Sequence, residues 1–266
     1  MIHQVLFEQF VGSFSAPPKE LILDFDCTDD RVHGMQVGRA FHGYYYDYCF
    51  LPLYVFCGEQ LLVSYLRPSN IDPAKHAWAI LAKLVSALRE RWPEVKIILR
   101  ADSGFCRWKV LRWCESHQVD YIVGIAKNER LKTLSAKLGQ RAERKHRKSG
   151  EKVRLFKRFK YRAGSWDKKR CIIAKAEHTA QGANPRFVVT NLVGHAQRLY
   201  DQVYCARGEM ENRITELARA QVGTIRLKLL KIGAVITRNT RRVRIWFSSA
   251  FPLKGLFKFC LACFYG

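Results

Sequence analysis

Three acidic residues in this chain could together hold divalent metal ions. Asp26 lies in the apolar run 21–28, Asp102 follows the aliphatic run 95–101, and Glu211 comes much later in the chain. A carboxylate beside a strand-like apolar run loses hydration on folding and requires a partner. In a strongly basic chain, we expect that partner to be a divalent cation together with a nucleic-acid phosphate.

The charge balance points to a polyanionic partner. The 266 residues include 46 Lys and Arg against 23 Asp and Glu, a formal net charge of +23. Such an excess repels itself unless a polyanion screens it, so nucleic acid is the leading partner and an anionic membrane surface the weaker one. The sequence contains no apolar stretch long enough to span a bilayer, and residues 1–10 lack the pattern of a signal peptide.

The cysteine pattern indicates a reducing compartment. Nine cysteines, an odd number, are scattered through apolar contexts, which is typical of reduced thiols in a cytoplasmic protein. Cys260 and Cys263 form a single CxxC pair without a second pair nearby, so we do not expect a zinc site.

The elements that must position the first two acids follow from the apolar patterning. After a short N-terminal helix, we expect strands 21–28, 44–57 and 60–67, a helix 72–91 that begins at Asp72–Pro73, strand 96–101, helix 107–116 and strand 119–126. This β-β-β-α-β-α-β order resembles the ribonuclease H-like arrangement, an α/β fold with a mixed sheet flanked by helices. In that fold, acids on the first and fourth strands meet at one edge of the sheet.

A basic segment separates the second acid from the third. We expect a helix 130–147 and strands 153–161, 171–177 and 186–192, and a later helix 209–218 that carries Glu211. The corresponding divisions are 1–127 for the first part of the core, 128–200 for a β-rich basic insertion, 201–218 for the third-acid helix and 219–266 for a basic tail.

Each of the first two acids has a simpler alternative role. Asp24 and Asp26 leave the same face of their strand, and we favour Asp26 as the ligand and Asp24 as its neighbour, with a shared role left open. Asp26 could instead cap a turn with Asp29 and Asp30. Asp102 could instead be the N-cap of the following helix. The pairing of the two acids favours the ligand role.

Tyr204, Arg207 and Glu211 are spaced three and four residues apart, so they share one face if the segment is helical. Tyrosine and arginine beside a carboxylate can hold phosphate oxygens, arginine through a bidentate fork. The alternative is a solvated helix face with an Arg–Glu pair. Two other acids compete for the third position, Glu209 and Glu216.

These motifs resemble those of DDE transposases of bacterial insertion sequences, which have a ribonuclease H-like catalytic core. Tyr204, Arg207 and Glu211 are similar to the family signature Tyr-x2-Arg-x3-Glu-x6-Lys. Five further segments are similar to one subgroup of the family: 23–30, 33–36, 44–58, 99–105 and 183–187.

The resemblance implies metal-dependent cleavage and transfer of DNA strands. Two ions, Mg²⁺ or Mn²⁺, would be held by Asp26, Asp102 and Glu211; water would attack at the transposon end, and the freed 3′-hydroxyl would attack target DNA. The expected partners are transposon-end DNA and target DNA, and a homodimer is compatible with the DNA complex. The expected location is the bacterial cytoplasm, at the nucleoid. The residues expected to contact phosphates are Tyr204, Arg207, Arg144, Lys145, Arg147 and Lys148.

The chain also departs from the family pattern. The final Lys of the signature falls at Ala218, little chain precedes Asp26, and residues 216–228 run almost directly into the basic tail. These departures predict a truncated, internally deleted copy with impaired strand transfer and a displaced Glu211. The alternative function is a non-catalytic DNA-binding remnant. A third, an RNA-binding protein of ribosomal type, would not need the acidic strand positions.

Overall fold

The computed structural model describes residues 2–32, 34–208, 210 and 212–214, and the strands 234–238 and 243–247. Residues 2–210 form one compact unit, and the two late strands belong to another, so each is described by itself. Glu211 lies outside the described residues, as do Glu209, Glu216, Ala218 and the CxxC pair, so the predictions made for them stay predictions.

Nine of the described strands form one mixed sheet in the order β11–β10–β12–β8–β7–β1–β5–β6, with β9 paired to β10. They are β1 (Glu20–Cys27), β5 (Leu53–Cys57), β6 (Gln60–Tyr65), β7 (Lys96–Ala101), β8 (Asp120–Ile125), β9 (Val153–Tyr161), β10 (Arg170–Thr179), β11 (Gly182–Ala183) and β12 (Arg186–Thr190). β1, β7 and β8 are parallel neighbours, whereas β5 is antiparallel to both β1 and β6.

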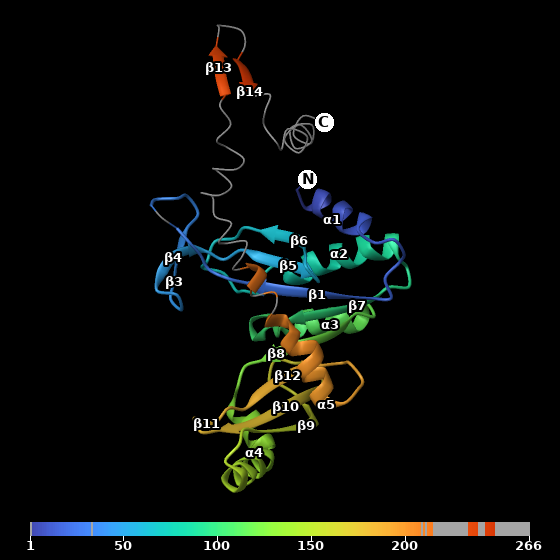
Figure 1. Cartoon of the computed structure of the whole chain (residues 1–266), viewed down its shortest axis with the longest axis vertical. Coiled ribbons are helices and arrows are strands. Elements are labelled where there is room, and N and C mark those ends of the chain that lie inside the picture. The colour runs from blue at the N-terminus through green and yellow to red at the C-terminus, as the bar shows by residue number, and fades with distance from the viewer. Residues whose placement is uncertain are drawn as a thin grey trace. The chain divides into compact units, whose positions relative to one another are not determined.

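The part of the sheet from β6 to β8 has the ribonuclease H-like arrangement. Three antiparallel strands lead into two parallel ones, and the crossovers contain α2 (Ala77–Arg91) and α3 (Trp108–Ser116) (Figure 1). This confirms the fold class predicted from the sequence. The other described helices are α1 (Ile2–Gly12), α4 (Glu129–Ser149) and α5 (Ala196–Arg198), the last continued by the π-helical segment Leu199–Tyr204 and the 3₁₀ turn Cys205–Arg207.

The two faces of the sheet have different cores. Leu23 and Phe25 point into the larger cluster, which contains buried side chains of α2, α3 and α4. Ile98 and Ile122 point to the other face, where Leu199 and Tyr200 of the helical segment cover them. Because side chains alternate along a strand, Asp24 and Asp26 leave the face that the helical segment covers.

The structure corrects two boundaries. The predicted strand 44–57 is two strands, and the first part, β4 (Asp47–Phe50), pairs with β2 (Asp30–Arg31) and β3 (Ala40–His42) in a separate small sheet (Figure 1). Pro52, which has no N–H to donate, stands between them. The helix predicted from Asp72 begins at Ala77, because the Asp72 carboxylate accepts a hydrogen bond from Ala74 N (2.8 Å) in a preceding turn.

The basic segment extends the core sheet. β12 pairs antiparallel with β8, β10 pairs with β12, and α4 packs on β9 and β10. In the second unit, β13 (Ala234–Arg238) and β14 (Val243–Phe247) form an antiparallel pair within the segment expected to be a basic tail. In the described part of the chain, no helix is long and apolar enough to cross a membrane.

Candidate active site

Asp26 and Asp102 stand side by side at the ends of neighbouring parallel strands. The last paired residues of β1 and β7 are Phe25 and Ala101, and the two aspartates follow directly. Adjacent strands lie about 4.8 Å apart. Asp26 is only 8% exposed and Asp102 is half-buried. The expectation that the two acids lie on adjacent strands is confirmed; their role as metal ligands stays a prediction.

Both aspartates also make local hydrogen bonds. Asp26 Oδ1 accepts from Cys27 N (2.9 Å), and Asp102 Oδ1 accepts from Gly104 N (2.9 Å). Asp102 therefore has the N-cap role that the sequence offered as an alternative, although it caps the 3₁₀ turn Ser103–Phe105 rather than α3. A carboxylate has two oxygens with about four lone-pair positions, so a cap through Oδ1 is compatible with metal coordination through Oδ2.

The first two residues of the third motif reach these aspartates. Arg207 Nη1 lies 3.4 Å from Asp26 Oδ1. Burial raises the pKa of Tyr204, and the nearby Asp102 charge adds to the shift while Arg207 opposes it. The Tyr204 phenol therefore keeps its proton at neutral pH and can donate a hydrogen bond to an anionic oxygen.

The helix before Glu211 begins earlier than expected. The sequence predicted a helix from residue 209, but the helical segment begins at Ala196 and passes through a π-helical stretch at Leu199–Tyr204. Leu199, Tyr200, Val203 and Tyr204 recur at helical spacing and pack on one core cluster, a periodicity that could have predicted this helix. π-Helical turns occur frequently at functional sites.

Gly124 on β8 is a site residue that the sequence analysis missed. A Cβ atom placed on it would lie 2.6 Å from Tyr204 Oη and 2.9 Å from Ser103 N. Only glycine therefore lets the tyrosine and the chain after Asp102 approach β8 this closely. An isolated glycine in a strand pattern is a signal of close approach that could have identified it.

Arg100 joins the sheet to the helical segment. Its Nε and Nη2 donate to the two oxygens of Asp24, the second at 2.6 Å, and its Nη1 donates to the Val203 carbonyl at 2.6 Å. Both side chains are buried, with 9% and 3% exposure. Asp24 thus neutralises Arg100 within the sheet, which favours Asp26 as the acid that faces a metal.

The donor chemistry at the strand ends suits a hard divalent cation. Two carboxylates are oxygen ligands of the kind that Mg²⁺ and Mn²⁺ prefer. The described residues contain no cluster of three His, Cys, Asp or Glu side chains, so these two need a further ligand, the role predicted for Glu211. Cys27 is adjacent, but burial raises the pKa of its thiol to about 12, and a neutral thiol is a poor metal ligand.

A cavity of about 170 Å³ opens beside Asp102. The rings of His42, Tyr44 and Tyr45 line one side of it, and Gly104 and Phe105 line the side next to Asp102. Burial raises the pKa of Tyr45 to about 12, with smaller contributions from Asp29, Tyr44 and Asp26. The cavity therefore has aromatic rings in its wall beside Asp102.

The basic cluster of α4 lies at the other end of the sheet. Arg144, Lys145, Arg147 and Lys148 are all exposed, and Arg147 pairs with Glu143 on the same helix (2.6 Å). Because α4 packs on β9 and β10, the strands β12 and β8 separate it from β7. The structure therefore does not bring this cluster to the two aspartates.

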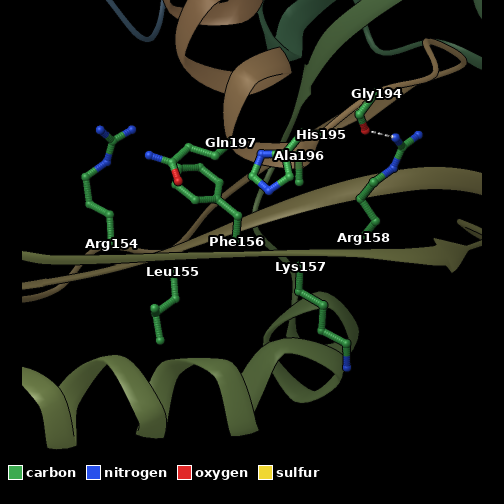
Figure 2. Close-up of a pocket in the computed structure, with 9 residues that line it drawn as sticks. All are labelled: Arg154, Leu155, Phe156, Lys157, Arg158, Gly194, His195, Ala196 and Gln197. Atoms are coloured by element: carbon green, nitrogen blue, oxygen red, sulfur yellow. Dashed lines mark hydrogen bonds between the residues drawn. The ribbon is translucent and has the colours of Figure 1, made fainter.

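A second hollow of about 400 Å³ lies between β9 and residues 194–197. Figure 2 shows Arg154, Phe156 and Arg158 on the side of β9 that faces His195 and Gln197, whereas Leu155 and Lys157 point toward α4. Arg158 donates to the carbonyls of Leu192 and Gly194, and Arg154 pairs with Asp201.

Comparison with known proteins identifies the family of the chain. The model of the family "Transposase DDE domain group 1" matches residues 1–217 and 215–264. No curated protein sequence matches the chain. A similar solved structure is piggyBac transposase in a synaptic complex with hairpin DNA, at 10% identity and a TM-score of 0.43, covering 75% of this chain. The chain spans only 41% of that protein's chain. Because the family model matches almost the whole chain, this protein belongs to the DDE transposase domain family, group 1.

Proposed function

We propose that this chain catalyses divalent-metal-dependent DNA cleavage and strand transfer in the transposition of an insertion sequence. The observation that carries the proposal is the pair Asp26 and Asp102 at the ends of β1 and β7, with Arg207 held against Asp26. Two carboxylates and a phosphate-binding fork at one sheet edge suit an in-line displacement at a phosphodiester.

Each residue at this edge has a chemical task. Asp26 and Asp102 would hold the metal ions, with Glu211 as the third ligand. Bound Mg²⁺ or Mn²⁺ supplies activation of the attacking oxygen and stabilises charge on the leaving oxygen. Tyr204 would donate a hydrogen bond to a phosphate oxygen, since its phenol keeps its proton.

The Arg207 guanidinium can pair with either of two anions, the Asp26 carboxylate or the scissile phosphate. In the described structure its guanidinium lies against Asp26 and balances that buried charge. A metal ion at Asp26 would take over this role, and Arg207 could then bind the scissile phosphate through its planar fork. Metal binding and phosphate binding are therefore expected to favour each other.

DNA bound along the face of the sheet that carries the acids would contact both the acids and the hollow at Arg154 and Arg158. Five strand-to-strand steps separate β1 from β9, or about 24 Å at 4.8 Å per step. About seven base pairs at 3.4 Å each cover that length. The hollow with Arg154 and Arg158 lies on one face of β9, and α4 with its basic cluster packs on the opposite face. The partners would be transposon-end and target DNA in a bacterial nucleoid, compatible with a homodimer.

A specific residue favours the second candidate, a DNA-binding remnant without catalysis. Ala218 falls where the family signature has a lysine, and an alanine cannot contact a phosphate. A chain that lacks this contact could still bind DNA through its net charge of +23.

Nicking of supercoiled plasmid in Mn²⁺ tests the proposal. The full chain should nick, Asp26→Asn and Asp102→Asn should lose at least about a hundredfold in rate, and the exposed Asp30→Asn should match the parent. All four should bind plasmid in EDTA with a steep salt dependence. Nicking that survives Asp102→Asn would refute the site. Binding without any metal-dependent nicking would establish the remnant.

A further inference from the structure

Two histidines meet where α4 lies on the sheet. His146 is in the last turn of α4, and His178 is near the end of β10. His178 alternates with Ala174 and Ala176 of the larger core, so it leaves β10 on the face that α4 covers. The two ring centroids are 5.1 Å apart, and the ring planes are inclined by 36°. Both side chains are half-buried, so an ion can reach them from solvent.

A hydrogen bond fixes the proton of the His146 ring. Its Nδ1 lies 2.6 Å from the Glu151 carbonyl oxygen, which can only accept, so Nδ1 carries the proton. In the neutral ring, Nε2 then has a free lone pair. Histidines that bind metal ions have this arrangement, in which one ring nitrogen donates to a carbonyl or carboxylate and the other binds the ion.

The second ring is available to the same ion. Within the described residues His178 has a ring contact with His146 and no hydrogen bond, so its ring can turn toward a shared ligand. With metal–nitrogen bonds of about 2.0–2.1 Å and a tetrahedral angle, two coordinating imidazoles have centroids about 5 Å apart. The observed separation of the two rings therefore fits one ion between them.

The charges around the pair do not prevent a cation from binding. The end of α4 is the negative end of its helix dipole, which favours a cation beside His146. Glu143 lies three residues before His146 on the same face of α4 and pairs with Arg147 (2.6 Å). Both effects offset the repulsion from the basic cluster of α4.

We propose that His146 and His178 bind a Zn²⁺ ion that joins the end of α4 to β10. Imidazole suits Zn²⁺, whereas Mg²⁺ prefers oxygen ligands, so this site is distinct in chemistry from the acidic pair Asp26 and Asp102. The described residues contain no group of three ligating side chains, so water completes the coordination of the ion. The ion would hold the basic cluster of α4 against the sheet, a role that goes beyond the proposed function.

Zn²⁺ alone is the probe, and titration calorimetry of the full chain under reducing conditions measures its binding. His146→Gln and His178→Gln should each lower the affinity at least about tenfold, because loss of a ligand costs no less than loss of its hydrogen-bond partner. His117→Gln is the matched control. Its Nδ1 also lies against a carbonyl, that of Trp113 (2.9 Å), but its ring stacks on Trp113 instead of a second histidine. This variant should bind Zn²⁺ as the parent does.

Two further measurements keep the inference open to refutation if a histidine variant folds poorly. Nitrogen NMR of the parent chain should show two histidine rings whose nitrogens shift on addition of Zn²⁺. Denaturant unfolding should show that Zn²⁺ raises the midpoint of the parent, because the ion binds the folded chain preferentially. Fewer than two responding rings, or an unchanged midpoint, would overturn the inference.

Equal Zn²⁺ affinity in the parent, His146→Gln and His178→Gln would also overturn it. Asp102→Asn should keep the histidine site; if it removes the Zn²⁺ binding that the histidine variants retain, the ion lies at the acidic pair and the inference fails. Plasmid nicking in Mn²⁺ separates the two proposals. His178→Gln should nick at the parent rate, so absence of nicking in every chain refutes catalysis alone, and absence of a histidine effect on Zn²⁺ binding refutes this site alone.

Discussion

The buried pair Asp24–Arg100 should matter more for activity than for stability. Replacing both residues by apolar side chains of similar volume can separate the effect on activity from the effect on stability. Arg100 makes two charge-assisted hydrogen bonds to Asp24 and one to the Val203 carbonyl. Removing one member leaves the other charged and buried. Asp24→Leu or Arg100→Met alone should therefore lower the free energy of unfolding by about 3–5 kcal/mol.

The double variant Asp24→Leu/Arg100→Met should behave differently. Replacing a buried ion pair by apolar side chains of similar volume is often neutral or stabilising by about 1–4 kcal/mol. The double variant also loses the bond from Arg100 to Val203, which is worth about 1.5–3 kcal/mol as a bond from a charged donor. These terms nearly cancel, so its stability should return to within about 2 kcal/mol of the parent.

Activity should not return with stability. Without Arg100 the Val203 carbonyl loses its hydrogen bond to β7, and the segment that carries Tyr204 and Arg207 can shift. Denaturant unfolding measures the first quantity and Mn²⁺-dependent plasmid nicking measures the second, with loss of about tenfold or more expected in the double variant. A double variant that is stable and nicks at the parent rate would refute the positioning role of Arg100.

Three further predictions follow from particular contacts. Gly124→Ala should lower stability by about 1–3 kcal/mol and reduce nicking, because its Cβ would lie 2.6 Å from Tyr204 Oη; unchanged values in both assays would contradict the close approach. Burial tends to raise the pKa of Glu177, but Lys152 and Lys175 outweigh it and lower the pKa from 4.5 to about 2, so its stabilising effect is complete above about pH 4.5 and is lost as the pH falls toward 2. Glu177→Gln should therefore flatten stability across that window in acid titrations followed by circular dichroism, and an unaltered profile would argue against the ion pairs. Duplexes shorter than about seven base pairs should bind with a smaller salt slope than longer ones, because they cannot span β1 to β9; slopes that do not change with length would exclude this path.

Local patterns were sufficient for most of the fold. β9 occupies residues 153–161 as expected, because apolar residues recur there at nearly every second position, and β12 lies within the predicted strand 186–192, because it is a short run of aromatic and β-branched residues. The predicted start of α2 was wrong. Asp72–Pro73 has the form of an N-cap and first helical residue, but the Asp72 carboxylate caps a separate turn. It also pairs with Arg107 (3.0 Å), a contact that the sequence does not reveal.

The site was only partly predictable, because its remaining contacts are long-range. Asp26 and Asp102 come at the ends of recognisable strands, and the resemblance of the element order to the ribonuclease H-like arrangement predicted that they meet. Arg100 and Val203 are 103 residues apart, and the sequence pattern around each residue does not predict its contact with the other. Gly124 is inconspicuous in a strand until the ring of Tyr204 is placed against it.

These long-range contacts give the third motif a structural task in addition to its chemical one. Three points of the helical segment contact three neighbouring strands: Val203 accepts a hydrogen bond from Arg100 on β7, Tyr204 lies against Gly124 on β8, and Arg207 pairs with Asp26 on β1. Contacts at three points hold both the position and the rotation of this segment against the sheet. The tyrosine and arginine of the motif would therefore act before any DNA binds, by holding the segment that precedes the third acid against β8 and β1.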